Sequence, residues 1–268
     1  MGQIIEFPAI KELNEEINEL KKNLEDFFVE RDHLLFVICE NIETEYMLNF
    51  GSLEYSLYKT YCDFLRLRRK KDMIQAKKNR KETIEIDAIE DVLDDEFIEY
   101  KKKLDDKISQ INKALERSKM ESLSKDDEEE IKKLYRDIVK RLHPDLNPEI
   151  TDAEKELFTN ATEAYEKGDI DGLRIIFEIV TIGGKEDKLS SSIEELQKEK
   201  KRLQSLVAKI KLEIHSIKAN PPYSLRIYVE DDEKKAEKLD ELKKELKSFQ
   251  EAIRTQEEYI NELLRREI

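Results

Sequence analysis

The residue types that most often carry out chemistry in proteins are few in this sequence. Its three histidines, His33, His143 and His215, do not stand at the i, i+4 spacing that places two metal ligands on one face of a helix. The two cysteines, Cys39 and Cys62, stand in apolar stretches without metal-ligand spacing, as buried free thiols do. Neither G-x-x-x-x-G-K-S/T nor G-x-G-x-x-G, the glycine patterns that hold phosphate, occurs. We therefore predict no catalytic site, no metal site and no cofactor, and we expect that the protein is not an enzyme.

The tripeptide His143-Pro144-Asp145 combines a titratable ring, a backbone constraint and a carboxylate in consecutive residues. Proline disfavours helical geometry in the residue before it, so a helix is expected to end at His143. Pro144 also fixes one backbone angle and lacks an N–H donor, which makes the loop rigid. Asp145 is then a carboxylate, which can only accept hydrogen bonds, on a rigid loop.

Helical patterns lie on both sides of this loop. Ser124, with Asp127 three residues later, forms a plausible capping box and predicts a helix that begins there. A second helix is expected over about 151–167, and a short third one over 169–182. The first helix carries an apolar face, which contains Ile131, Leu134, Ile138 and Leu142, and a basic stripe, which consists of Lys132, Arg136 and Lys140.

The residues EIKKLYRDIVKRLHPDLNPE, followed by LFTNATEAYEKGD, resemble the J domain of the DnaJ-like co-chaperones. The resemblance covers about residues 124–167 and implies a helical hairpin whose connecting loop carries the tripeptide. It also implies that this module recruits a DnaK-type chaperone and accelerates ATP hydrolysis by that partner. The implied partner-binding site consists of His143, Pro144, Asp145, Tyr135, Arg136, Lys132, Lys140 and Asn147.

The resemblance gives these residues expected roles. Asp145 would make a bidentate contact with an arginine of the partner. His143 would donate a hydrogen bond within the loop and hold its shape. The basic stripe would meet an acidic groove on the ATPase, where it would contribute association rate and orientation more than affinity. Tyr135, beside the stripe, would be an aromatic contact with the partner.

The sequence departs from the family pattern at several positions. Leu146 and Asp137 stand where basic residues are usual, and Thr159 replaces a usual lysine. No family-type first helix precedes Ser124, and we expect a helix over residues 87–118 to pack in its place. The basic last helix, the Gly/Phe-rich linker and the CxxCxGxG zinc module of the family are also missing from the sequence. These departures keep an alternative open, namely a structural or scaffold protein whose J-like hairpin no longer stimulates an ATPase.

The part before the J-like segment carries long helical patterns, over residues 9–40, 43–81 and 87–118. Residues 66–81 hold nine basic side chains and one acidic one, whereas residues 85–99 hold eight acidic side chains and no basic one. A short connection should fold these two runs antiparallel, so that they neutralise each other. The alternative is a basic patch for nucleic acid or another acidic partner.

The C-terminal part carries two strict heptad patterns, over residues 187–217 and about 232–265. A Pro-Pro pair lies between them and cannot continue a helix. The patterns predict an antiparallel coiled-coil hairpin in which the polar seam residues Lys200 and Gln256 fix the register, and a parallel dimer through each arm is the competing arrangement. The predicted domains are therefore a helical bundle over 1–120, a J-domain-like module over 121–184 and a coiled-coil hairpin over 185–268.

Composition limits the class of protein. Of 268 residues, 42% are charged and only 6 are glycine and 5 proline, which excludes a turn-rich all-β fold and favours an all-α fold. The net charge of −14 argues against nucleic acid or acidic lipid as a partner. The longest apolar run, Leu34–Cys39, is too short for a membrane span, and the N-terminus lacks a secretory pattern. We expect a cytoplasmic protein, a monomer or coiled-coil dimer, whose helical arms choose the client protein or the location.

Overall fold

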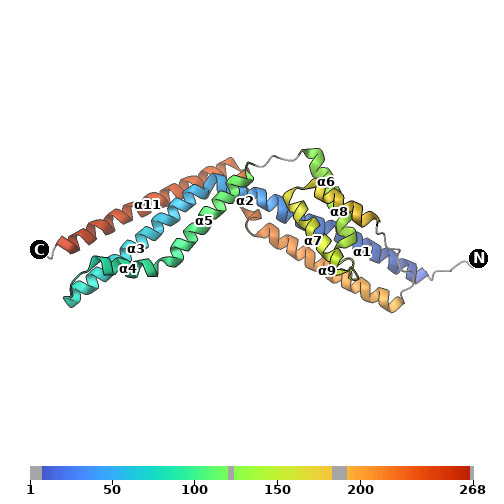
Figure 1. Ribbon diagram of the computed structural model, residues 1–268, viewed down its shortest axis with the longest axis horizontal. Helices are drawn as coiled ribbons and strands as arrows, with labels where there is room; N and C mark the ends of the chain where they lie inside the picture. The colour runs from blue at the N-terminus through green and yellow to red at the C-terminus, as the bar shows by residue number, and fades with distance from the viewer. Residues whose placement is uncertain (1–7, 120–123, 183–191, 266–268) are drawn as a thin grey trace, which may run out of the picture. The chain divides into compact units, whose positions relative to one another are not determined.

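Figure 1 shows a computed structural model of the chain, which describes residues 8–119, 124–182 and 192–265. These residues form helices joined by short connections, and none of the described ranges contains a β-strand. The all-α prediction is therefore confirmed. None of the described helices is both long enough and apolar enough to cross a membrane. The chain forms two compact units, and each unit combines segments that are distant in the sequence.

The first unit comprises Met1–Asn41 and Glu121–Ser224. Its described elements are α1 (Pro8–His33), the π-helix η1 (Leu34–Cys39), α6 (Lys125–Leu142), α7 (Asp152–Lys167), α8 (Ile170–Ile182) and α9 (Ile193–Ala219). One core joins these helices, and its largest fully buried side chains are those of Leu24, Phe28, Tyr135, Ile138, Val139, Leu173 and Leu203.

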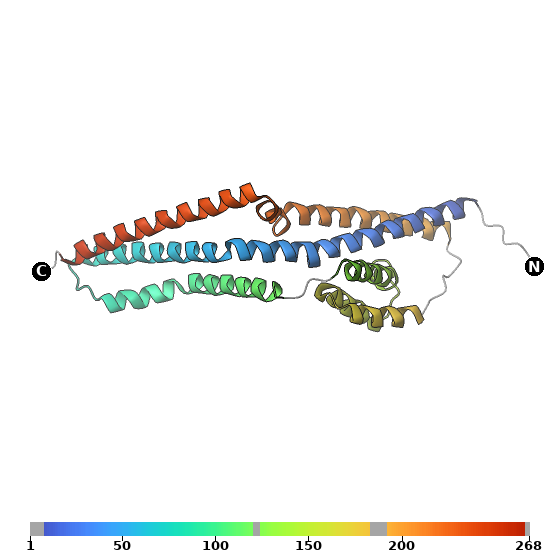
Figure 2. The ribbon, with the colours of Figure 1, turned by 90° about the horizontal axis from the view of Figure 1, so that it is seen from above.

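Helices α1 and α9 run side by side in the same direction within this unit (Figures 1 and 2). Near their N-terminal ends, Lys200 of α9 donates a hydrogen bond to Glu16 of α1. Near their C-terminal ends, Lys218 Nζ lies 2.7 Å from Glu30 Oε1. Because the residue numbers of both helices rise together from the first pair to the second, the two heptad-like faces pack in parallel.

The second unit comprises Ile42–Met120 and Leu225–Ile268, and α2 (Glu40–Tyr46) contains the division between the two units. The other described elements of this unit are the π-helix η2 (Met47–Gly51), α3 (Ser52–Arg80), α4 (Ile86–Glu96), α5 (Ile98–Arg117), α10 (Arg226–Glu230) and α11 (Asp232–Arg265); a 3-10 turn, η3 (Tyr223–Leu225), precedes α10. Helices α3 and α11 also pack in parallel, since the ring of Phe249 lies 5.3 Å from that of Tyr61 and Lys78 donates to the carbonyl oxygen of Leu263.

The structure corrects the predicted C-terminal hairpin over residues 185–268 and the domain boundaries that depended on it. Helix α9 packs against α1 in the first unit, and α11 packs against α3 in the second. A heptad pattern specifies an apolar seam but does not specify the helix that covers it. Lys200, expected to fix the register between the two arms, instead pairs with Glu16 of α1.

The helix expected over residues 87–118 is two helices, α4 and α5. Phe97 lies between them with φ −102° and ψ 10°, outside helical geometry. Its side chain is 9% exposed and stacks on Tyr100, with ring centroids 4.9 Å apart. Neither glycine nor proline marks this break in the sequence, so the apolar period alone did not predict it.

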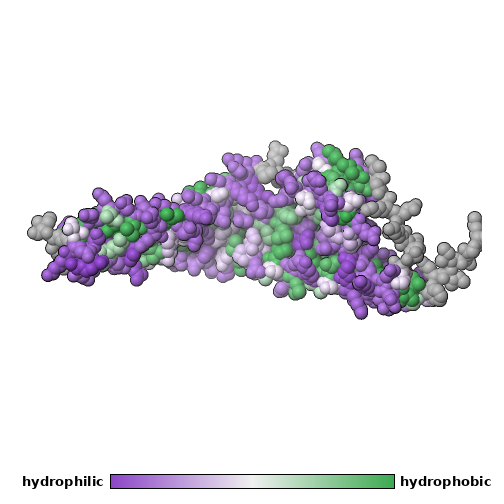
Figure 3. All heavy atoms as spheres, turned by 60° about the horizontal axis from the view of Figure 1, so that its bottom comes forward, coloured by the Kyte–Doolittle hydropathy of each residue, from purple (hydrophilic) through white to green (hydrophobic). Residues whose placement is uncertain are grey.

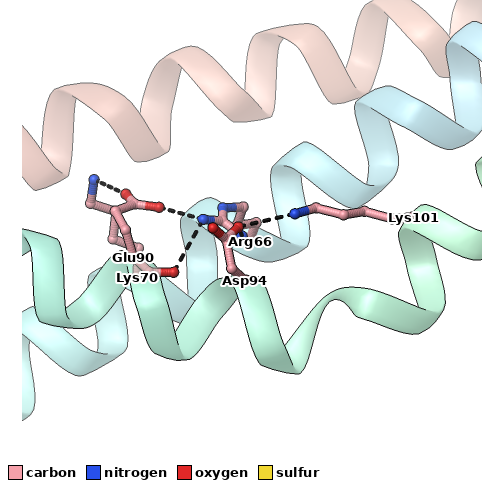
Figure 4. A network of polar contacts seen from close by, with 5 residues as sticks. All are labelled: Arg66, Lys70, Glu90, Asp94 and Lys101. Atoms are coloured by element: carbon pink, nitrogen blue, oxygen red, sulfur yellow. Dashed lines mark hydrogen bonds and ion pairs between the residues drawn. The ribbon is translucent and has the colours of Figure 1, made fainter.

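The basic and acidic runs face each other in the second unit, as predicted (Figure 4). The ion pairs between the runs are Arg66–Glu90, Lys70–Glu90, Arg66–Asp94 at 3.0 Å and Arg69–Glu96 at 2.8 Å. Lys101 of α5 also pairs with Asp94, at 3.1 Å. The hydrogen bond from Lys70 is the main cause that lowers the pKa of Glu90 below its usual value. Arg66, Arg69 and Lys70 of the basic run therefore meet acidic side chains of the same chain, which weakens the alternative of a nucleic-acid patch.

Hydrophilic side chains predominate on the face of the molecule drawn in Figure 3, with separate hydrophobic patches between them. This surface agrees with the high content of charged residues. The most exposed large apolar side chains in the described ranges include Leu212 on α9 and Ile175 on α8, at 70% and 60% exposure.

Candidate functional site

Helices α6 and α7 are packed on each other as a hairpin, and local sequence signals fix their ends. The Ser124 hydroxyl accepts a hydrogen bond from the amide of Asp127 at 3.1 Å, so the predicted start of α6 is confirmed, although this is only one half of the predicted capping box. Thr151 and Glu154 form a reciprocal capping box at the start of α7. Helix α7 ends at Gly168, whose φ of 68° is the left-handed conformation that glycine adopts easily.

The loop between the two helices is held by its own hydrogen bonds. Helix α6 ends at Leu142, and His143 has extended geometry with ψ 123°, as expected before a proline. The His143 carbonyl accepts the amides of Leu146 at 3.0 Å and Asn147 at 2.9 Å. The Asn147 side-chain amide donates to the carbonyl of Lys140 at 3.0 Å, which ties the loop back to α6. The Asn147 side chain therefore helps to hold the loop, and its expected contact with a partner stays a prediction.

The His143 ring is a buried part of this loop, with 6% of the residue exposed. It lies between Phe28 of α1, at a centroid distance of 3.6 Å, and Phe158 of α7, at 5.2 Å. Burial lowers the pKa of His143 to about 4, so the ring is neutral at pH 7. Its Nδ1 accepts the amide N–H of Asp145 at 3.1 Å. The expected role of His143 in holding the loop therefore takes a different form, because the ring accepts this hydrogen bond rather than donating one.

Asp145 lies at the exposed tip of the loop, beside the exposed Pro144. Within the described part of the chain, its carboxylate forms no ion pair and no hydrogen bond. Its main-chain N–H is bonded to His143, and its main-chain carbonyl accepts a hydrogen bond from Arg202 of α9 at 2.8 Å. The loop thus presents one free carboxylate on a backbone that is hydrogen-bonded on both sides.

Comparison with known proteins identifies the segment that forms this hairpin. Residues 121–167 match the family model of the DnaJ domain. Over 40 residues, 15% of the chain, the sequence is 58% identical to two proteins named Chaperone protein DnaJ, from two strains of Desulfitobacterium hafniense. That alignment spans 10% of the length of these relatives. No solved structure matches the chain. The resemblance seen in the sequence is therefore confirmed for this segment.

Tyr135 of the J-domain segment is buried, with 0% exposure, so its expected role as a surface contact is wrong. Its hydroxyl donates to Asp32 of α1 at 2.7 Å, and its ring stacks on Tyr165 at 4.2 Å. Positions 131, 135, 138 and 142 follow helical steps of four, three and four, and all four residues are buried. Leu134, which the helical pattern predicts for this face, is only half-buried.

Helix α1 packs where the missing first helix of the J-domain segment was expected, and this corrects the assignment of residues 87–118 to that place. Two tyrosines of the hairpin bond to consecutive residues of α1. Tyr135 bonds to Asp32, and the Tyr165 hydroxyl lies 3.2 Å from His33 Nδ1. Asp32 is 2% exposed and is also bound by Arg31, while burial raises its pKa above the usual value.

The basic stripe lies beside acidic residues of α1. Arg136 pairs with Asp26 at 3.3 Å, although the Arg136 side chain keeps 56% exposure. Burial raises the pKa of the neighbouring Glu25, and the positive charges of Lys140 and Arg136 act in the opposite direction. Lys140 is exposed and Lys132 is half-buried. The structure therefore brings all three stripe residues to one face, but α1 borders that face.

Two departures from the family pattern have local explanations. Leu146 is 5% exposed and belongs to the core of the first unit, so an apolar residue is required there. Thr159 is exposed, and its hydroxyl donates to the carbonyl of Lys155 at 3.1 Å. The structure gives no particular reason for Asp137.

Three residues of this site were missed in the sequence, and all come from outside the matched segment. Phe28 covers His143, Asp32 binds Tyr135, and Arg202 binds the backbone of Asp145. Asp32 stands in the polar run Glu30-Arg31-Asp32-His33, so its position in the sequence did not mark it as a buried residue. Nothing in the sequence pairs Phe28 or Arg202 with the loop.

Proposed function

We propose that the J-domain segment recruits a DnaK-type chaperone and stimulates its ATP hydrolysis, and that the other helices choose the client protein or the location. The observation that carries this proposal is the exposed, unpaired carboxylate of Asp145 on a loop with a fixed backbone. Rigid presentation matters because less conformational entropy is lost when the partner binds.

The carboxylate suits an arginine of the partner, which offers two parallel N–H donors. A charge-assisted contact of this kind contributes about 1.5–3 kcal/mol, which corresponds to roughly a ten- to hundredfold effect on coupling. The exposed ammonium and guanidinium groups of Lys140 and Arg136 would meet acidic groups beside that arginine.

The test is a single-turnover ATPase assay with a DnaK-type chaperone and the full chain. Asp145→Asn keeps the size of the side chain and removes its charge, so it should melt like the parent within about 0.5 kcal/mol. Stimulation should fall roughly ten- to hundredfold. Asp240→Asn on α11 is the matched control, because Asp240 is also an exposed aspartate, paired only along its own helix with Lys244. If Asp145→Asn stimulates like the parent, the loop only connects the two helices and its carboxylate does not contact the partner.

A second candidate is a scaffold function without ATPase stimulation. It is favoured by the ion pair between Arg136 and Asp26, since one member of the basic stripe already has an acidic partner in the same chain. The scaffold function takes precedence if the parent binds partner proteins but stimulates no DnaK-type chaperone.

We further propose that the chain is not itself an enzyme, acts in the cytoplasm and binds neither nucleic acid nor membranes. The ion pairs of Arg66, Arg69 and Lys70 with the acidic run support the absence of nucleic-acid binding, because these three side chains are engaged within the second unit.

A further inference from the structure

Helix α9 lies outside the segment that matches the DnaJ domain, yet it contacts the tip of the loop. The Arg202 guanidinium donates from Nη1 to the carbonyl oxygen of Asp145 at 2.8 Å. Arg202 is itself fixed by Glu199 one turn earlier on α9. Its Nε and Nη2 each donate to a Glu199 carboxylate oxygen at 2.7 Å, in the bidentate geometry that arginine favours.

The consequence for Asp145 is that both of its main-chain polar groups are bound by side chains. The His143 ring holds the N–H, and Arg202 holds the carbonyl. A rotation of the peptide groups on either side of Asp145 would break one of these bonds. The direction in which the carboxylate points is therefore set partly by a helix that follows the J-domain segment.

Glu199 has a second effect, on charge. Arg202 lies close enough to Asp145 for the two charges to interact, so an unpaired guanidinium could take the carboxylate for itself. Glu199 occupies two of the guanidinium donors and lowers the net charge of the pair to zero. Arg202 can then hold the backbone while the Asp145 carboxylate stays available to a cation on the partner.

We infer that Arg202 is a positioning residue for the partner contact of Asp145, and that Glu199 keeps Arg202 from competing with the partner. This inference rests on the proposed function, because it concerns the same loop and the same DnaK-type partner. The inference means that the partner contact of Asp145 also depends on α9, which lies outside the matched segment.

The experiment measures single-turnover ATPase stimulation against the concentration of the full chain, for the parent and three single variants. Arg202→Gln should raise the half-saturating concentration about three- to tenfold, the range of one lost charge-assisted hydrogen bond. Arg202→Lys keeps a cationic donor and should recover part of this loss. Glu199→Gln should also weaken the coupling, and its defect should shrink at high salt because the competing ion pair is screened.

The matched control is Lys209→Gln. Lys209 lies on the same helix and pairs with Glu213 at 3.8 Å, so its loss removes one positive charge from α9 without touching the loop. This control should stimulate like the parent. Thermal melting of every variant shows whether the fold is kept, and Glu199→Gln serves in place of Arg202→Gln if the latter does not fold.

A double variant separates positioning from a merely structural role. If Arg202 acts through Asp145, then Asp145→Asn combined with Arg202→Gln should couple no worse than Asp145→Asn alone. Additive losses would overturn the inference. It is also overturned, with the proposed function intact, if the parent stimulates and Arg202→Gln has the same half-saturating concentration. If the parent does not stimulate at all, both the proposed function and this inference are rejected.

Discussion

The ring of Phe28 in α1 is stacked on the ring of His143, with centroids 3.6 Å apart and an angle of 20° between the planes. The N-terminal helix thus covers the one histidine of the loop that presents Asp145. Phe28 itself is 2% exposed, so the pair belongs to the core of the first unit. A histidine in this place is a structural group that stays neutral at pH 7, because burial removes water from its charged form.

Acid should destabilise the fold through His143. Its pKa is about 4 in the folded chain and close to 6.5 when the chain is unfolded. Between these values the unfolded state binds more protons, so the free energy of unfolding falls as the pH is lowered from about 6.5 to about 4. The full effect is about 2–4 kcal/mol. Urea unfolding at several pH values, compared between the parent and His143→Gln, measures it.

The comparison isolates His143 from its neighbours. Burial raises the pKa of Asp32, and this contributes a pH dependence of opposite sign that is present in both proteins. The parent should therefore lose more stability than His143→Gln between pH 6.5 and 4. Equal losses in the two proteins would contradict a buried neutral histidine.

Tyr135→Phe should lower the stability of the protein without changing the contact between the protein and its proposed DnaK-type partner. The substitution removes the hydroxyl that donates to the buried Asp32, and a buried acceptor left with one partner fewer costs about 1–3 kcal/mol. Denaturant unfolding measures the loss. Tyr259→Phe is the control, because Tyr259 is 51% exposed and its change should be nearly neutral. Stimulation per folded molecule should equal that of the parent; a stable variant with lost stimulation would restore Tyr135 as a contact residue.

Removing the acids beside the basic stripe should speed association with a DnaK-type chaperone, if the proposed function holds. Glu25→Gln with Asp26→Asn takes negative charge away from Arg136 and Lys140, so the positive field of the stripe increases. We expect the association rate constant to rise about two- to fivefold at low salt and to converge on the parent value at high salt.

The control for this pair is Asp240→Asn with Glu241→Gln on α11. It gives the same change in net charge, and both residues pair with lysines along their own helix. Surface plasmon resonance measures both rate constants. An unchanged or slower association of the Glu25/Asp26 variant would show that these acids do not restrain the stripe.

The parent should not shift a random DNA duplex at physiological salt. Three residues of the basic run that could bind phosphate, Arg66, Arg69 and Lys70, are paired with acids of α4. Glu90→Lys with Glu96→Lys replaces two of these acids by bases and should give binding that weakens steeply with salt. A mobility-shift titration compares the two proteins. Tight, salt-sensitive binding by the parent would show that the basic run is a nucleic-acid site after all.

The sequence was sufficient for those parts of the site whose causes are local. Ser124, Pro144 and Gly168 each act on their own backbone or that of near neighbours, and the helix ends that they predict are present. The opposing charge runs were also predictable, because the connection between α3 and α4 is too short for another arrangement.

Helix partners were not predictable in the same way. The face of α9 could have been covered by any long apolar helix face, and α1 covers it through contacts such as Lys200–Glu16. The same ambiguity hid Phe28, Asp32 and Arg202 from the site, since each reaches it from a helix far away in the sequence. The prediction of Tyr135 as a surface contact was a smaller error, because the choice between adjacent positions of a helix face depends on where the partner helix lies.

The parallel pairing of α1 with α9 has a consequence for synthesis on the ribosome. The apolar side chains of α1, such as Ile17 and Leu24, are made early, whereas Leu203 and Ile210 of α9 come from the last third of the chain. At ~5–20 residues per second, about 10–40 s pass between the completion of the two helices. During that interval α1 can pack on α6, which is already made, but the face of α1 that α9 covers in the folded chain still lacks this partner.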